Sequence, residues 1–178
     1  MKVVDMNTLM PEQQRSAQRE AEILSQLRHP AIIEYIGHER TIDKKRGLDT
    51  FTLFIELCTC SLETQLQKIA KQERPDFSDK EKWTIAHQIC SALQYLHTSD
   101  PQILHRDIKS GNVLLNLGRN DNVIDVRLAD FGLCGVGPKN AKHVSVIGSR
   151  RWMAPEVFNR NYNAKCDGKK LLQQATHT

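Results

Sequence analysis

The sequence predicts an α+β fold, with strands and one helix in the first third of the chain and mainly helices after it. Runs of β-branched and aromatic residues at 32–36 and 51–57 predict strands in the first third. Apolar residues three and four positions apart predict one helix from Pro11 and a longer one after Ser78. With 178 residues, of which 39% are hydrophobic and 26% charged, the chain is long enough to bury a core.

The first third is expected to hold the sheet and a single helix. Val3 and Val4 predict the end of a short strand. The helix is predicted to begin at Pro11, because proline suits the first helical position, and to end at His29-Pro30. Strands 32–36 and 51–57 flank a polar turn at 43–47. The inward face of the helix carries Ala17, Glu20, Leu24 and Leu27.

The rest of the chain is predicted to be mainly helical. Ser61 is expected to cap a helix that runs to about Gln72. Ser78 and Glu81 form a capping box, so a longer helix begins there. Short strands are predicted at 113–115 and 126–129, on either side of a polar turn at 118–121. The buried face of the longer helix is predicted to carry Ala86, Ile89, Leu93 and Leu96.

Composition excludes several classes of protein. The net charge of +4 is mild and dispersed, and no aromatic platform or zinc-finger spacing accompanies it, so no nucleic-acid partner is expected. No apolar run reaches the roughly 18 residues of a membrane span. The five cysteines form no disulfide framework, which favours a cytoplasmic protein, with the nucleus as the alternative. Cys58 and Cys60 form a lone C-x-C, too few ligands for zinc.

Three short motifs point to a particular chemistry. They are HRDIKSGN at 105–112, DFG at 130–132 and APE at 154–156, in that order. Together they resemble the eukaryotic protein kinase catalytic domain of the serine/threonine type, in the tyrosine-kinase-like or a related group. Taken singly, the acids of these motifs would be read as ordinary turn residues. The ordered set, with a hydrophobic run between the first two motifs, favours the kinase interpretation.

The resemblance implies an ATP- and Mg²⁺-dependent enzyme that phosphorylates serine or threonine of a protein substrate. Asp107 would orient the substrate hydroxyl, and Lys109 would neutralise the transferring phosphate. Asn112 and Asp130 would bind Mg²⁺ through oxygen atoms. Phosphoryl transfer needs positioned metal ions, neutralised charge and an oriented nucleophile, and these residue types supply all three.

Two further groups are implied for nucleotide binding. Lys2 would hold the α- and β-phosphates and pair with Glu20, because Glu20 shares the apolar stripe of its helix whereas Glu22 faces water. A frayed terminal lysine is the alternative for Lys2.

The second group is the segment that would bind the adenine. The resemblance implies that Ile55 gates the pocket behind the base. The backbone of Glu56 and Cys58 would form hydrogen bonds with the adenine.

Regulation is expected to involve the segment after DFG. Arg106 would pair with a phosphate there, with Ser145 as the preferred phosphorylation site and Ser149 as the second. The alternative is that Ser145 is an unmodified loop hydroxyl.

The resemblance also divides the chain. It implies a two-lobed fold, with 1–56 in a small β-sheet lobe with one helix and 57–167 in a helical lobe, followed by an unrelated, disordered tail at 168–178. Against a family domain of about 250 residues, we expect truncation at both ends, without the first two strands and with the helical lobe ending near the start of its central helix. The kinase activity of this chain is therefore expected to be weak or absent, and the alternative function is a non-catalytic, kinase-derived interaction module.

Overall fold

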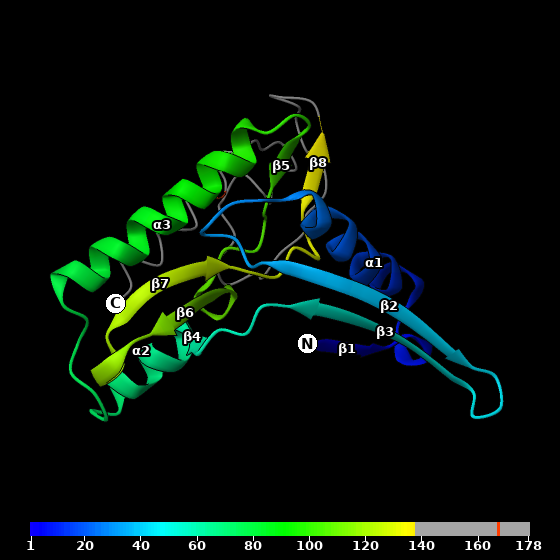
Figure 1. Cartoon of the computed structure of the whole chain (residues 1–178), viewed down its shortest axis with the longest axis horizontal. Coiled ribbons are helices and arrows are strands. Elements are labelled where there is room, and N and C mark those ends of the chain that lie inside the picture. The colour runs from blue at the N-terminus through cyan, green and yellow to red at the C-terminus, as the bar shows by residue number, and fades with distance from the viewer. Residues whose placement is uncertain (138–166, 168–178) are drawn as a thin grey trace.

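Three small antiparallel sheets and three α-helices make up the residues that the structure describes, 1–137 and 167, in a computed structural model (Figure 1). The mixed α+β character predicted from the sequence is therefore present. In chain order the elements are β1 (Lys2–Asp5), α1 (Pro11–Gln26), β2 (Tyr35–Asp43), β3 (Leu48–Ile55), β4 (Cys60–Ser61), α2 (Leu62–Ala70), α3 (Asp79–Thr98), β5 (Gln102–Leu104), β6 (Val113–Leu117), β7 (Val123–Leu128) and β8 (Gly135–Gly137), with short 3-10 turns at Met6–Thr8, Ser110–Asn112 and Arg119–Asp121.

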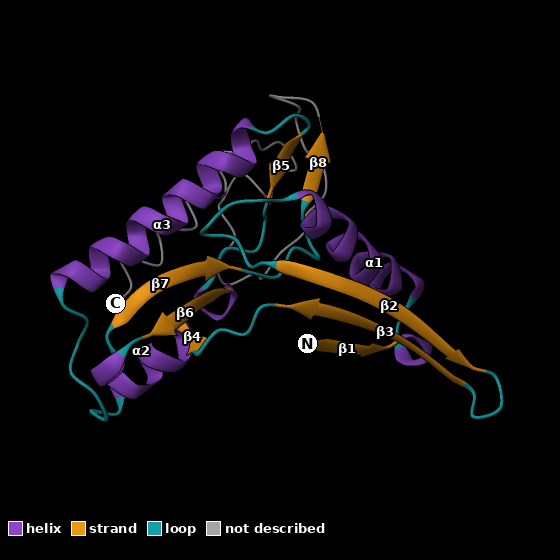
Figure 2. Cartoon of the chain, viewed as in Figure 1, coloured by secondary structure: helices purple, strands orange, loops and turns teal. Residues whose placement is uncertain are grey.

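The first sheet has the strand order β1-β3-β2, and α1 packs against it (Figure 2). Its central strand buries Phe51 and Leu53 on one face and Thr52 on the other, because successive side chains of a strand face opposite sides. The predicted strands were misplaced at their ends. Tyr35 begins the first strand, since Ile32 makes only an isolated parallel bridge with Leu128 of β7. The second strand begins at residue 48 and ends at 55.

Helix α1 begins at Pro11 as predicted, but it ends at Gln26, before the predicted end at His29-Pro30. Pro11 occupies its first turn, and the Gln13 side chain accepts a hydrogen bond from the Met10 backbone N–H at 3.0 Å. Its inward face buries Glu20 and Leu24, while Glu22 is exposed. The helix thereby presents one carboxylate to the interior, where a buried charge requires a partner.

Helix α3 packs along β7 of the second sheet, whose strand order is β4-β6-β7. Both hydrogen bonds of its predicted capping box are present, between Ser78 and Glu81. Ala86, which we predicted on the buried face, is exposed. The buried stripe is centred nearer Ile85, so Ala86 lies at its edge, about 75° from the centre at 100° per residue. The buried residues of this helix are Ile85, Ile89, Ala92, Leu93 and Leu96.

A third ladder, between β5 and β8, was not predicted. Leu104 lies opposite Gly135, so the chain just before His105 runs beside the chain just after the DFG motif. Both segments contribute to one core, since Ile103 and Cys134 belong to the same buried cluster as Ile108, Leu128 and Phe131.

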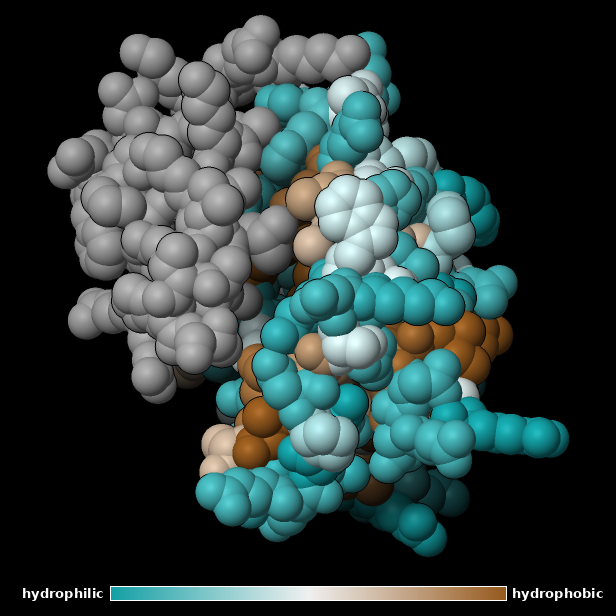
Figure 3. All heavy atoms as spheres, turned by 90° about the vertical axis from the view of Figure 1, so that its left-hand side faces the viewer, coloured by the Kyte–Doolittle hydropathy of each residue, from teal (hydrophilic) through white to brown (hydrophobic). Residues whose placement is uncertain are grey.

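One face of the described residues is mostly hydrophilic (Figure 3). Figure 3 shows this for the face that carries α2 and α3, where small hydrophobic patches interrupt a polar surface. No helix among the described residues combines the length and the apolar character needed to cross a membrane.

Candidate functional site

The loop between β5 and β6 carries the HRDIKSGN motif and is held from beneath by a buried carboxylate. Asp167 is fully buried, and its Oδ2 accepts hydrogen bonds from the His105 backbone N–H and from His97 Nε2, both at 2.9 Å. Its Oδ1 accepts from the Arg106 backbone N–H at 2.9 Å. Burial alone would raise the pKa of Asp167, but these donors outweigh it and hold the pKa below its ordinary value. The Asp167 carboxylate therefore remains ionised and fixes the start of the loop.

His105 connects this loop to the DFG segment. Its Nε2 lies 3.0 Å from the Ala129 carbonyl oxygen, and its Nδ1 accepts a hydrogen bond from the Asp107 backbone N–H at 3.3 Å. These partners assign the proton to Nε2 of a neutral ring. Complete burial lowers the pKa of His105, in agreement with the neutral form. The ring also meets Phe131 edge-on, with centroids 4.9 Å apart.

The peptide groups of Ala129 bring Asn112 and Asp130 together. The Ala129 backbone N–H donates to the Asn112 carbonyl oxygen at 2.9 Å, while its own carbonyl receives the His105 hydrogen bond. Asp130 follows at once with φ of +65°, a conformation that a non-glycine residue adopts at some cost in energy. Arg106, on the opposite loop, also has φ of +65°. Two strained residues thus flank the hydrogen bonds that join the loops.

Asp107 is 2% exposed and lies at the centre of the loop. Its Oδ2 accepts hydrogen bonds from Lys109 Nζ at 2.6 Å and from Asn112 Nδ2 at 2.9 Å. Asn112 Nδ2 also donates to the Asp107 carbonyl oxygen at 2.8 Å. Because the amide nitrogen of Asn112 makes both of these bonds, its oxygen remains the atom that can act as a ligand.

Mg²⁺ fits this set of oxygens better than a metal that needs an all-protein cage. Among residues 1–137 and 167, no group of three or more His, Cys, Asp or Glu side chains is arranged to hold a metal ion. The site offers instead the Asn112 amide oxygen and the Asp130 carboxylate, whose side chain is 43% exposed. Mg²⁺ characteristically binds one or two protein oxygens and completes its shell with water and substrate phosphates.

Lys2 joins α1 to the DFG segment. Its Nζ lies 2.6 Å from Glu20 Oε2 and 3.7 Å from Asp130 Oδ1. Burial raises the pKa of Glu20, whereas for Lys2 the neighbouring carboxylates outweigh burial and its pKa is raised. Lys2 also pairs with Leu53 in the β1–β3 ladder, so it belongs to the sheet and is not a frayed terminus.

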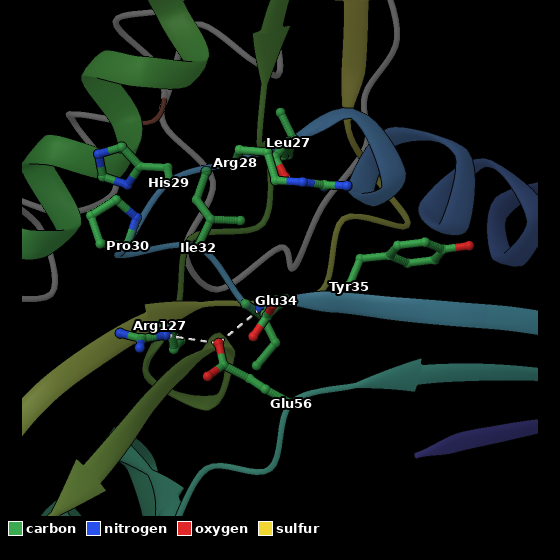
Figure 4. A pocket seen from close by; sticks show the side chains of 10 residues that line it. Leu27, Arg28, His29, Pro30, Ile32, Glu34, Tyr35, Glu56 and Arg127 are labelled. Atoms are coloured by element: carbon green, nitrogen blue, oxygen red, sulfur yellow. Dashed lines mark hydrogen bonds and ion pairs between the residues drawn. The ribbon is translucent and has the colours of Figure 1, made fainter.

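The predicted adenine-binding segment follows β3. Ile55 ends that strand, and the backbone N–H of Glu56 donates to the Glu34 carbonyl oxygen at 3.0 Å. Glu56 Oε1 accepts from the Glu34 backbone N–H at 2.8 Å and from Arg127 Nε at 2.7 Å (Figure 4). Since its N–H is already bonded, only the Glu56 carbonyl could face a base. Burial, with the Glu56 carboxylate nearby, raises the pKa of the Cys58 thiol to about 11, so the thiol is protonated at neutral pH.

A cavity of about 260 Å³ lies beside Glu56, between the segment that precedes β2 and the end of β7 (Figure 4). Leu27, Pro30 and Ile32 form part of its apolar wall, and Arg127 part of its polar wall. None of Lys2, Asp107, Asn112 and Asp130 lines this cavity, so it is separate from the residues described above.

The regulatory prediction concerns Arg106, Ser145 and Ser149, of which the structure describes Arg106. Ser145 and Ser149 lie outside the described residues. Arg106 is 7% exposed, and Gly135 lies directly against its guanidinium, since a Cβ at Gly135 would fall 2.1 Å from Nη2. The pairing of Arg106 with a phosphate stays a prediction.

Several contacts at the site were not predicted from the sequence. Ser16 Oγ donates a hydrogen bond to the Gly132 carbonyl oxygen at 2.6 Å, across 116 residues of chain. Its position one turn before Glu20, on the same face of α1, is a signal that could have drawn attention to it. The contacts of Glu56 with Glu34 and Arg127 left no comparable signal in the sequence.

Comparison with known proteins identifies the family. Residues 1–168 match the family described as protein kinase domain, so the chain belongs to that family. Mitogen-activated protein kinase kinase kinase 1a of Physcomitrium patens is 34% identical over 168 residues, which are 91% of this chain and 20% of that protein.

Two similar proteins come from Dictyostelium discoideum. Probable serine/threonine-protein kinase nek2 is 33% identical over 150 residues, 83% of this chain and 34% of that protein. Serine/threonine-protein kinase pakH is 33% identical over 151 residues, 84% of this chain and 26% of that protein. The chain thus spans about a fifth to a third of the length of these curated relatives.

Proposed function

We propose that this chain carries the phosphoryl-transfer residues of a serine/threonine protein kinase, which moves the γ-phosphate of ATP to a hydroxyl of a protein substrate. Residues 1–56 form part of the small lobe, and residues 57–167 form part of the helical lobe. One observation carries the proposal: Asp107 and Asn112 are hydrogen-bonded to each other, and hydrogen bonds of the Ala129 backbone connect their loop to the loop that bears Asp130.

Each side chain has a defined task in this proposal. Asp107, hydrogen-bonded to Lys109, accepts the hydrogen bond of the substrate hydroxyl and orients it towards the phosphate. Lys109 lies beside the same oxygen and offers its positive charge to the transferring group. The Asn112 amide oxygen and the Asp130 carboxylate hold Mg²⁺. When bound, Mg²⁺ supplies the positive charge that neutralises the phosphate oxygens.

The opposite wall of the site binds the nucleotide. Lys2, oriented by Glu20, faces the Asp130 carboxylate and donates to the α- and β-phosphates. The Glu56 carbonyl and the Cys58 backbone bind the adenine, and Ile55 closes the space behind it. Specificity for serine and threonine is supported by Lys109 within the DIKSGN sequence and by the similarity to relatives named as serine/threonine-protein kinases.

The test compares the chain with its Asp107→Asn variant in a transfer assay with Mg²⁺ and labelled ATP on a serine- and threonine-rich protein. We expect the substitution to lower the rate of transfer at least about 100-fold, the smallest usual contribution of a positioned acid–base residue. Binding of Mg²⁺·ATP, measured by calorimetry, should persist. Asp121→Asn is the control, because Asp121 lies in an exposed turn with φ of +56°, which asparagine tolerates.

Two outcomes contradict the proposal. The first is an unchanged rate of transfer in Asp107→Asn. The second is affinity for Mg²⁺·ATP that is equal in the parent chain and in Asp130→Asn. Binding of Mg²⁺·ATP without measurable transfer by the parent chain would favour the non-catalytic, kinase-derived interaction module.

A further inference from the structure

Helix α1 contacts the DFG segment through two residues one turn apart. Glu20 bonds to Lys2 Nζ, which lies 3.7 Å from Asp130 Oδ1. Ser16 donates directly to the carbonyl oxygen of Gly132. The helix therefore contacts the segment on both sides of Phe131, through Lys2 at Asp130 and through Ser16 at Gly132.

The fit around Ser16 is close. A Cβ at Gly132 would lie 3.0 Å from Ser16 Oγ, so the glycine lets the hydroxyl approach the backbone. The Cys134 backbone N–H donates to the Phe131 carbonyl oxygen at 3.1 Å, which closes a turn with Gly132 inside it. The Ser16 hydroxyl thus fixes the middle of a turn that begins next to Asp130.

Asp130 needs such support because of its backbone. Its φ of +65° is costly for a residue with a side chain, and such conformations persist only where the surroundings determine them. On the side of the loop between β5 and β6, the hydrogen bonds of the Ala129 backbone provide that support. On the side of α1, the hydrogen bond from Ser16 is the direct link to the backbone that follows Phe131.

We propose that Ser16 is a positioning residue. Its hydroxyl holds the turn after Phe131 against α1, and this keeps the Asp130 carboxylate in position to bind Mg²⁺·ATP together with Asn112 and Lys2. The proposal rests on the function proposed above, because it assigns Ser16 an effect on the Mg²⁺ site. It predicts that loss of the hydroxyl weakens the use of Mg²⁺ without unfolding the chain.

The experiment compares Ser16→Ala and Ser16→Thr with the parent chain. Ser25→Ala is the matched control, since Ser25 lies on the same helix and bonds only to the Glu22 carbonyl of its own turn, at 2.7 Å, in the contacts described. The first measurement is hydrogen exchange at the Cys134 amide. We expect exchange roughly threefold to tenfold faster in Ser16→Ala, the effect of one lost hydrogen bond. Ser16→Thr should restore the parent rate, and Ser25→Ala should not change it.

The second measurement is the Mg²⁺ concentration that half-saturates ATP binding. It should rise in Ser16→Ala, return towards the parent value in Ser16→Thr, and stay unchanged in Ser25→Ala. Equal exchange in Ser16→Ala and the parent chain, or no recovery in Ser16→Thr, would overturn the proposal. If the parent chain binds no Mg²⁺·ATP, the proposed function fails, whereas the exchange measurement still decides whether Ser16 holds the turn.

Discussion

The imidazole of His105 links the two loops of the candidate site. His105 accepts from the Asp107 N–H on one nitrogen and donates to the Ala129 carbonyl from the other, so it can serve both loops only while neutral. Asp107, Asp130 and Asp167 all favour its charged form, yet burial outweighs them and lowers its pKa. Protonation would remove the acceptor for the Asp107 N–H and place a charge in the core.

Stability should therefore depend on pH through His105. In the unfolded chain its pKa is about 6.5, and in the folded chain it is lower. Below about pH 6.5 the unfolded state binds the extra proton, so the His105 contribution is complete above that pH and is lost as the pH falls. Between pH 7.5 and 5.5, urea unfolding should show a decline that exceeds that of His105→Gln by up to about 1.4 kcal/mol per pH unit.

His87→Gln is the control, because His87 is exposed. It should retain the pH dependence of the parent chain. Asp167 does not titrate within this pH range. A carboxylate with a lowered pKa loses its contribution to stability only as the pH falls below the ordinary pKa of 3.8. An equal slope in His105→Gln and the parent chain would show that His105 is not the titrating group.

The sequence suggests the residues of the candidate site, whereas it does not reveal the side chains that support them. Asp107, Asn112 and Asp130 belong to short motifs whose spacing carries the information. Ser16 and Arg127 do not, because their partners lie far away in the chain and any donor of suitable length could stand in their place. Contacts between residues so far apart in the chain can be recognised only from the folded structure.

At the scale of elements, helices were predictable and strand ends were not. The capping box at Ser78 and the proline at position 11 are local signals, and both helices begin where these signals stand. Strand β8 is three residues long, from 135 to 137, and has no periodicity of its own. It exists because residues 102–104 supply a partner, which no local pattern reveals.

Gly135 of the β5–β8 ladder lies against the Arg106 guanidinium. We expect Gly135→Ala to lower the free energy of unfolding by about 1–3 kcal/mol, the usual cost of overpacking, because its Cβ would fall 2.2 Å from Cζ of the buried Arg106. Urea unfolding measures the change. Gly37→Ala is the matched control, since no atom lies within 4 Å of its added Cβ. A loss of equal size in both variants would mean that strand conformation, not contact with Arg106, is responsible.

At the scale of the whole molecule, Glu56 joins the first sheet to the second. It lies between β3 and β4, bonds to the Glu34 N–H ahead of β2, and pairs with Arg127 of β7. Arg127 is also paired with Asp125 on its own strand. Because β7 leads directly to Asp130, this contact relates the predicted adenine-binding segment to the site.

A double-mutant cycle with Glu56→Gln and Arg127→Gln tests this junction. The two substitutions should be non-additive in urea unfolding, with an interaction energy of about 0.5–3 kcal/mol, as is typical of residues within one network. The same cycle with Arg40→Gln and Asp49→Gln, an exposed pair on the β2–β3 hairpin, should show a smaller interaction energy. Additive effects at Glu56 and Arg127 would show that this ion pair does not couple the two sheets.

The position of Asp167 in the chain has a consequence for synthesis. The His105 and Arg106 amides find their acceptor 62 and 61 residues further on. At about 5–20 residues per second, a ribosome needs roughly 3–12 s to travel that distance. During that interval the nascent loop lacks the carboxylate that fixes its two leading peptide groups. The loop that bears Asp107 is thus expected to take its final shape later than the first sheet, whose strands are complete by residue 55.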